Sequence, residues 1–201
     1  MDTAVGIDLS GLSRRTKGRT ALAQLSVEDR PRLLDRRLFE RGEGSDVAVV
    51  GWVLEHGPRV VAIDAPLTLP HAVTCSLRGC PRCQPGAAPH QLRDVDTMVK
   101  GMPTSMLAAI AFRGIYFARH FREAGIEVIE TYPAGSYRRL GADPHNTEAV
   151  DRALSELIAG FVAESRDERD AVAAGLAAAQ HARGRGVCVE GADGTIWLIS
   201  P

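Results

Sequence analysis

The first third of the chain alternates short apolar segments with polar turns, a pattern that indicates strands. Residues 5–9 form one such segment, and two more follow at 20–25 and 31–39 with a polar turn between them. We predict that these three strands pair as an antiparallel meander. Residues 45–56 differ, because their apolar residues recur at helical spacing and Gly57 stops the repeat, so they predict a helix.

The remaining pattern predicts two strands, three long helices and a closing hairpin. The first of these strands is a continuous apolar run, typical of a central strand covered on both faces. The last helix starts at a capping box, in which Ser165 precedes Glu168 by three residues. Cys188, within an apolar strand, is predicted to be a core residue. The predicted ranges are 59–63 and 126–129 for the strands, Thr104 or Ser105 to Glu123, Asn146 or Thr147 to Phe161 and Ser165 to Gly184 for the helices, and 187–189 with 196–199 for the hairpin.

This order of elements predicts an α/β protein of the ribonuclease H-like class, with a mixed sheet flanked by helices. In that class a three-strand antiparallel meander is joined to further parallel strands. A Rossmann-type fold would need a helix between the first two strands, and residues 14–19 are too short and too polar for one. We predict a single domain over residues 1–201, interrupted by an irregular insertion at 68–103 that is rich in Pro, Gly and Cys.

Composition and charge narrow the functional classes. A chain of 201 residues, 45% hydrophobic, has enough material for a full core without disulfides. The net charge of −1 gives no global attraction to nucleic acid, so a polyanion would need a local patch or metal ions. No apolar run reaches the roughly 20 residues that cross a bilayer, and no signal peptide is evident, so a cytoplasmic protein without a membrane partner is expected. The cysteines then favour a metal or redox site over disulfides.

Four aspartates carry the clearest chemical signal. Asp8 and Asp64 end two apolar strands, and the ends of neighbouring parallel strands lie side by side. Asp167 and Asp170 are three residues apart and share one face of a helix. Singly, such residues are usually turn formers or favourable charges at a helix N-terminus. Together they predict a site for magnesium or manganese, with Asp8, Asp64 and Asp170 as ligands.

Four spaced motifs resemble the domain-of-unknown-function 429 family, described as predicted nucleases with a ribonuclease H-like fold. They are Gly6-Ile-Asp-Leu-Ser-Gly11, Val61-Ala-Ile-Asp-Ala-Pro-Leu67, Glu130-Thr-Tyr-Pro-Ala134 and Asp167-Glu-Arg-Asp-Ala171. The acidic positions are also similar to those of RuvC-type junction resolvases, which implies catalytic roles for Asp8, Asp64, Asp167 and Asp170. Glu130 resembles the family's Glu-x-x-Pro motif and is expected to reach the same edge of the sheet; a plain polar residue at a strand end is the alternative.

The insertion contains a second candidate metal site. Cys80 and Cys83 have knuckle-like spacing, Cys75 precedes them by five residues, and His71 and His90 flank the three cysteines. We predict zinc held by the three cysteines and one of the two histidines. An iron–sulfur cluster and a set of free thiols are the alternatives.

These signals lead to two functional hypotheses. The first is a metal-dependent nuclease that hydrolyses DNA or RNA phosphodiester bonds by a two-metal-ion mechanism. The second is a non-catalytic module of the same fold, whose zinc-stabilised loop docks a partner. A sugar-kinase or actin-like ATPase is disfavoured, because it needs two such domains and a second glycine-rich phosphate loop. The sequence does not specify an oligomeric state.

Overall fold

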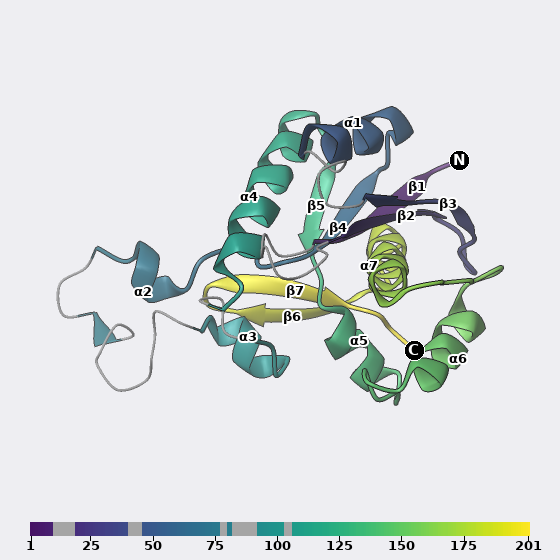
Figure 1. The fold of residues 1–201 in the computed structure, drawn as a ribbon. Helices are drawn as coiled ribbons and strands as arrows, with labels where there is room; N and C mark the ends of the chain where they lie inside the picture. The colour runs from purple at the N-terminus through teal and green to yellow at the C-terminus, as the bar shows by residue number, and fades with distance from the viewer. Residues whose placement is uncertain (10–18, 40–45, 77–79, 82–91, 103–105) are drawn as a thin grey trace.

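A five-stranded sheet in the order β3-β2-β1-β4-β5 forms the centre of the computed structural model (Figure 1). The structure describes residues 1–9, 19–39, 46–76, 80–81, 92–102 and 106–201. β1, β2 and β3 pair antiparallel, whereas β4 is parallel to β1 and β5 is parallel to β4. The predicted meander and central strand are therefore confirmed. The strands are β1 Thr3–Asp8, β2 Thr20–Ser26, β3 Leu33–Phe39, β4 Val60–Asp64 and β5 Glu127–Glu130.

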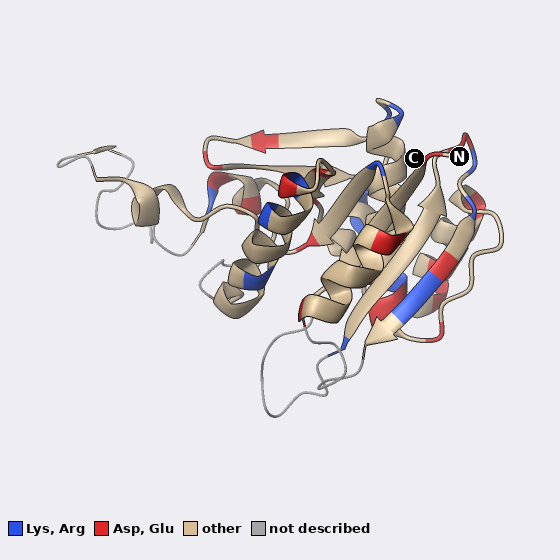
Figure 2. Cartoon of the chain, turned by 90° about the horizontal axis from the view of Figure 1, so that it is seen from above, with Lys and Arg blue, Asp and Glu red and all other residues tan. Residues whose placement is uncertain are grey.

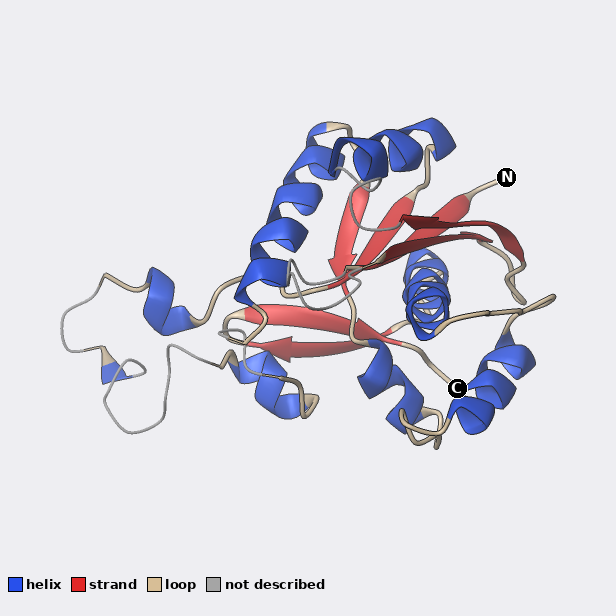
Figure 3. Cartoon of the chain, in the orientation of Figure 1, coloured by secondary structure: helices blue, strands red, loops and turns tan. Residues whose placement is uncertain are grey.

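Helices cover both faces of this sheet (Figure 3). Helices α1 (Asp46–His56) and α4 (Ala108–Glu123) lie on one face, and α7 (Arg166–Ala182) lies on the other. Side chains alternate between the faces along each strand. In β1, Val5 and Ile7 pack in the cluster that contains α1 and α4, whereas Ala4 packs against α7. β4 repeats this alternation, so even-numbered positions of both strands face α7.

Glycine lets α7 lie almost in contact with the backbone of β1. A Cβ atom on Gly6 would lie 2.0 Å from the backbone nitrogen of Gly175, and a Cβ on Gly175 would lie 2.5 Å from Leu25 Cδ1. No side chain fits within the first of these distances, so the crossing requires glycine at position 6. This close crossing sets the short distance between α7 and β1.

The second half of the chain adds a hairpin and shorter helices beside the sheet. The hairpin of β6 (Val187–Gly191) and β7 (Gly194–Leu198) is the predicted closing element, and Trp197 bridges to Thr131 just after β5. Helix α6 follows the expected pattern, whereas α5, α2 and α3 were not predicted. These helices are α2 His71–Thr74, α3 Asp94–Met98, α5 Pro133–Arg139 and α6 Thr147–Leu157.

Two details differ from the sequence-based expectations, and a third lies outside the described residues. Helix α6 ends at Leu157, because Ile158 takes an extended conformation; its side chain is nevertheless buried. The described part of α4 begins at Ala108, and the predicted starting residues Thr104 and Ser105 lie outside the described residues. Cys188 is exposed, so its prediction as a core residue is wrong. The hairpin packs one face only, and Cys188 alternates with the inward-facing valines of β6.

The outer strand β3 carries charges of both signs in sequence, with Asp35 followed by Arg36 and Arg37 (Figure 2). Arg36 forms ion pairs with Glu164 and Glu168, so part of this charge is neutralised within the chain. None of the helices in the described ranges is long and apolar enough to cross a membrane.

Candidate functional site

Asp8 and Asp64 lie side by side at the ends of the two central strands. They occupy the same register position in the parallel pairing of β1 with β4. Both are even-numbered, so the alternation that turns Ala4 and Ala62 towards α7 turns these carboxylates to the same face. Each side chain is partly buried. The end of the sheet thus presents two neighbouring acids towards one helix.

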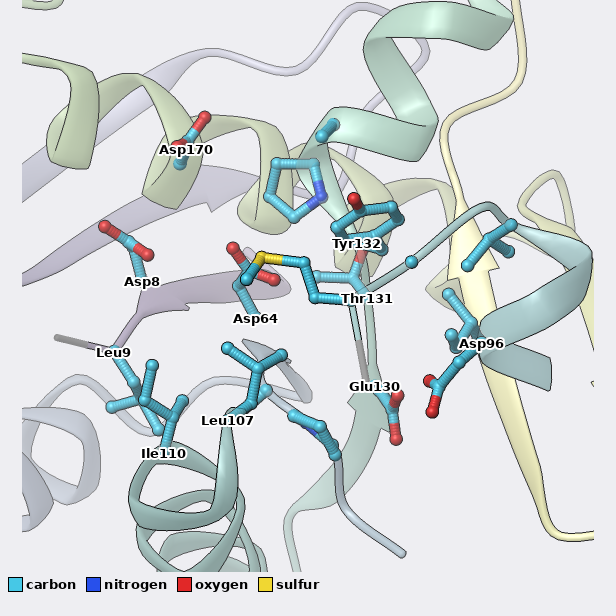
Figure 4. Close-up of a pocket in the computed structure, with 18 of the residues that line it drawn as sticks. Asp8, Leu9, Asp64, Asp96, Leu107, Ile110, Glu130, Thr131, Tyr132 and Asp170 are labelled. Carbon is cyan, nitrogen blue, oxygen red and sulfur yellow. The ribbon is translucent and has the colours of Figure 1, made fainter. Parts of the chain in front are cut away.

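Helix α7 brings two more acids to this edge. Its first turn is set by the predicted capping box, in which Ser165 Oγ accepts the N–H of Glu168 and the Glu168 carboxylate accepts the N–H of Ser165. Asp167 lies in this first turn and Asp170 one turn later. Both line the same cavity as Asp8 and Asp64. Figure 4 shows Asp8, Asp64 and Asp170 around one space, approached from two strands and one helix.

Two side chains from outside the predicted motif hold Asp170. The Tyr137 hydroxyl donates a hydrogen bond of 2.7 Å to Asp170 Oδ1. Arg166 Nε lies 3.5 Å from Asp170 Oδ2, and the Arg166 side chain is 69% exposed. One partner is therefore buried within the fold, while the other lies exposed at the mouth of the cavity.

The electrostatics of this edge disfavour ionised carboxylates. Burial, followed by repulsion from Asp64 and Asp170, raises the pKa of Asp8 well above its ordinary value. Burial and the charge of Asp170 likewise raise the pKa of Asp64. For Asp170, burial raises the pKa, although the Tyr137 hydrogen bond and Arg166 partly oppose it. A divalent cation would relieve this repulsion and hold the acids in their charged form.

The cavity measures about 370 Å³ and combines these acids with an apolar wall that includes Leu107 and Ile110. Its oxygen-only donor set suits magnesium or manganese. The ligand oxygens of Asp8, Asp64 and Asp170 do not all lie within 4.8 Å of one another. The predicted triad is therefore brought to one cavity without being drawn into a single coordination shell. The contacts that Tyr137 and Arg166 make with both oxygens of Asp170 favour this wider arrangement.

Glu130 belongs to a different, closed cluster. It pairs in register with Ile63, so it turns to the sheet face opposite Asp64. Its Oε2 accepts 2.8 Å from Arg93 Nη1 and 2.7 Å from the Leu67 N–H. Arg93 also contacts Asp96, and its side chain is 1% exposed. Figure 4 shows Glu130 and Asp96 together, away from Asp8 and Asp170.

The pKa shifts of this closed cluster reflect burial together with the attraction between Arg93 and two carboxylates. Burial raises the pKa of Glu130, while the hydrogen bonds of Arg93 and Leu67 oppose that rise. Burial alone would lower the pKa of Arg93, but its bonds to Glu130 and Asp96 raise it above the ordinary value. These contacts favour a positioning role for Glu130 over the catalytic role expected from the sequence.

Arg93, Asp96, Tyr137 and Arg166 were missed by the sequence analysis. Arg93 and Asp96 had a detectable signal, because opposite charges three residues apart are typical of a helix start. Both residues lie in the segment 68–103, which the sequence predicts to be irregular. Tyr137 had no comparable signal, since its role depends on α5 packing beside α7.

The insertion brings part of the predicted cysteine site together. One ligand atom from each of His71, Cys75 and Cys80 lies within 4.8 Å of the other two, so this group could hold a metal ion. Cys80 Sγ lies 3.5 Å from His71 Nε2. The other predicted ligands, Cys83 and His90, lie outside the described residues.

No protein-family model matches the chain, and no curated protein matches it. The resemblance to the domain-of-unknown-function 429 family therefore stays a prediction. Among solved structures, Thermus thermophilus RuvC matches with a TM-score of 0.54 and 15% sequence identity, covering 96% of this chain and 99% of that one. The T. thermophilus RuvC complex with a Holliday junction matches with a TM-score of 0.54 and 14% identity, covering 97% and 99%.

These matches span nearly the whole chain, but identity near 15% carries only the fold. The order and directions of the five strands agree with that likeness. The chain therefore has the mixed α/β fold of the ribonuclease H-like class that RuvC shares, as the sequence predicted.

Proposed function

We propose that this chain is a divalent-metal-dependent nuclease that hydrolyses nucleic-acid phosphodiester bonds. The observation that carries the proposal is the convergence of Asp8, Asp64 and Asp170 on one cavity. Burial raises the pKa of all three carboxyl groups, and repulsion from neighbouring acids raises those of Asp8 and Asp64 further. Carboxylates kept together at such a cost are typical of sites built for a cation or for catalysis.

The fit to magnesium or manganese rests on the donor set and its placement. We propose that Asp8, Asp64 and Asp170 hold two such ions, with Asp8 shared and Asp167 at the rim. The bound ions would supply an activated water and neutralise the leaving oxygen of a phosphodiester. Asp8 and Asp64 form the base of the site, because the pairing of β1 with β4 holds them side by side.

The residues around the acids have separate tasks in this proposal. Tyr137 orients Asp170 through its hydroxyl. Arg166 lies at the mouth, where its guanidinium could turn from Asp170 to a phosphate of the incoming strand. The net charge of −1 makes such local contacts necessary, because the whole chain does not attract a polyanion.

The likeness to RuvC with a bound Holliday junction makes branched DNA the first substrate to test. The experiment compares cleavage of four-way junction, duplex, single-stranded DNA and RNA–DNA hybrid in manganese, magnesium, calcium or chelator. We expect cleavage in manganese or magnesium only, because calcium accepts a looser geometry. Asp8→Asn and Asp64→Asn should each lower the rate by about 10³-fold or more, a loss of roughly 4 kcal/mol of transition-state stabilisation.

Asp2→Asn is the matched control, because it makes the same change at a side chain that is 63% exposed. Its activity should equal that of the unaltered chain. Absence of cleavage across the whole panel would contradict the proposal, as would cleavage that persists in Asp8→Asn. Nucleic-acid binding without cleavage would favour the non-catalytic module instead.

A further inference from the structure

The strongest unassigned feature outside the acidic cavity is the group of His71, Cys75 and Cys80. We propose that these three residues form a structural zinc site, which ties Cys80 to helix α2. The proposal is independent of the nuclease activity. It rests on the three described ligands and on the distances between their donor atoms.

The base of the insertion is held by the turn of the β6–β7 hairpin. Asp193 accepts the backbone N–H of His71 through Oδ2 at 3.2 Å and the backbone N–H of Asp94 through Oδ1 at 2.8 Å. Its carbonyl accepts the Thr68 hydroxyl at 2.6 Å. One residue thus clamps both the outgoing and the returning chain, and it fixes the backbone from which the His71 ring extends.

The local fold then gathers the donors. Helix α2 is one turn long, and the Cys75 N–H donates to the His71 carbonyl at 2.8 Å. Residues four apart lie on one side of a helical turn, so His71 and Cys75 face the same direction. Cys80 lies on this same side and is buried, with 8% of its surface exposed.

The distance between two of the donors agrees with tetrahedral zinc. Zn–N bonds of about 2.05 Å and Zn–S bonds of about 2.3 Å at the tetrahedral angle separate nitrogen from sulfur by about 3.6 Å. The observed distance from His71 Nε2 to Cys80 Sγ is 3.5 Å. One imidazole and two thiolates are a donor set typical of zinc, whereas the usual iron–sulfur clusters take four thiolates.

Helix α2, in the insertion, gains little stability from packing. Helix α2 buries none of its residues and has no side-chain N-cap, and Val73 is 54% exposed. In Figure 1 this helix stands apart from the sheet and its covering helices. A segment that buries so little apolar surface gains little from the hydrophobic effect, so its order calls for another source of free energy. Metal binding supplies such energy in small sites.

The test is metal analysis of the full chain, purified without chelator. We expect about one zinc per chain, and replacement by cobalt should give the visible absorption of a tetrahedral cobalt–thiolate site. His71→Ala and Cys75→Ser should lose the zinc while keeping the far-ultraviolet circular dichroism of the sheet and its helices. Cys188→Ser is the control, because this exposed thiol lies outside the group, and it should keep the zinc.

Two measurements guard against variants that fail to fold. Cobalt titration of the unaltered, metal-stripped chain tests the site without any substitution, and thiol labelling should speed up only after the metal is removed. No zinc together with no cobalt spectrum would overturn the proposal. Iron with acid-labile sulfide would also overturn it, in favour of a cluster. Retention of stoichiometric zinc in His71→Ala would overturn the ligand assignment.

Discussion

Two clusters of buried charge lie in the walls of one cavity and differ in how that charge is balanced. In the open cluster, Asp8 and Asp64 are neighbours, and the positive charge that partly lowers their pKa values belongs to Arg166, whose side chain is 69% exposed. In the closed cluster, Glu130 and Asp96 share Arg93, which is 1% exposed. The open cluster relies on an exposed guanidinium, while the closed one carries a buried counter-ion.

The difference teaches which carboxylates are available for chemistry. A carboxylate whose oxygens are occupied by a buried guanidinium and a backbone N–H has little capacity left for a metal ion or substrate. Glu130 is in that state. Asp8 and Asp64 keep their coordination capacity, at the expense of electrostatic stability. We therefore expect substitutions in the two clusters to have opposite effects on folding.

The largest effect on stability is predicted for Arg93→Met, which breaks the closed cluster. The variant leaves Glu130 and Asp96 buried without their cation, so the free energy of unfolding should fall by about 3–5 kcal/mol. The loss should shrink at low pH, because protonation of Glu130 removes the unpaired charge. Urea denaturation across a pH series measures both effects.

Arg119→Met is the matched control for this experiment. Arg119 pairs with Glu123 on the surface of α4, where its side chain is 78% exposed. Its removal should leave the free energy of unfolding nearly unchanged, because solvent screens an exposed ion pair. Equal losses in the two variants would contradict the distinction between the closed cluster and an ordinary ion pair.

The sequence predicted the open cluster well because strand parity and strand ends can be read from a hydrophobic pattern. Asp8 and Asp64 each follow a buried strand, and the parallel order places those ends together. Glu130 lines the same cavity, as expected, but the direction of its side chain was not predicted. Its strand is four residues long, and its register with β4 could not be known, so the sequence did not reveal that it pairs with Ile63 and faces away from Asp64.

Contacts between distant segments account for the rest of what the sequence did not predict. Tyr137 reaches Asp170 only because α5 follows β5 and lies against α7. Arg93 pairs with a glutamate 37 residues later. Neither pairing has a periodic signature. The glycine at position 6 carried a readable hint, but its meaning, a backbone crossing with Gly175, needed the position of α7.

A smaller effect of opposite sign is predicted for Asp8→Asn in the metal-free protein. Because the folded-state pKa of Asp8 is raised, the folded protein binds this proton more tightly than the unfolded chain does. Stability from this group is therefore complete below the unfolded pKa of about 3.9 and is lost as the pH rises through the folded value. Asparagine removes that loss, so the variant should be more stable than the unaltered chain at pH 7.

Thermal denaturation in chelator, from acidic to neutral pH, measures this difference. The advantage of Asp8→Asn should vanish at low pH and grow towards neutrality, while Asp2→Asn should follow the unaltered chain. Manganese should then stabilise the unaltered chain more than Asp8→Asn. A variant that is less stable than the unaltered chain at pH 7 would show that the carboxylate of Asp8 is satisfied within the fold.

The smallest predicted effect concerns Tyr137→Phe, which sharpens the comparison at the one acid of the open cluster that has a fixed partner. The substitution removes the 2.7 Å hydrogen bond to Asp170 and leaves the aromatic ring in place. We expect a stability loss of about 1 kcal/mol, the usual net value of one hydrogen bond. Manganese affinity, measured by calorimetry, should weaken by about tenfold, because a residue that orients a metal ligand typically contributes that much.

Tyr116→Phe on α4 is the control for this prediction. Tyr116 is 43% exposed and does not line the cavity, so stability and manganese affinity should both stay unchanged. Unaltered manganese affinity in Tyr137→Phe would mean that Asp170 is oriented by α7 alone. The hydroxyl would then serve only to satisfy a buried oxygen, as the backbone N–H of Leu67 does for Glu130 in the closed cluster.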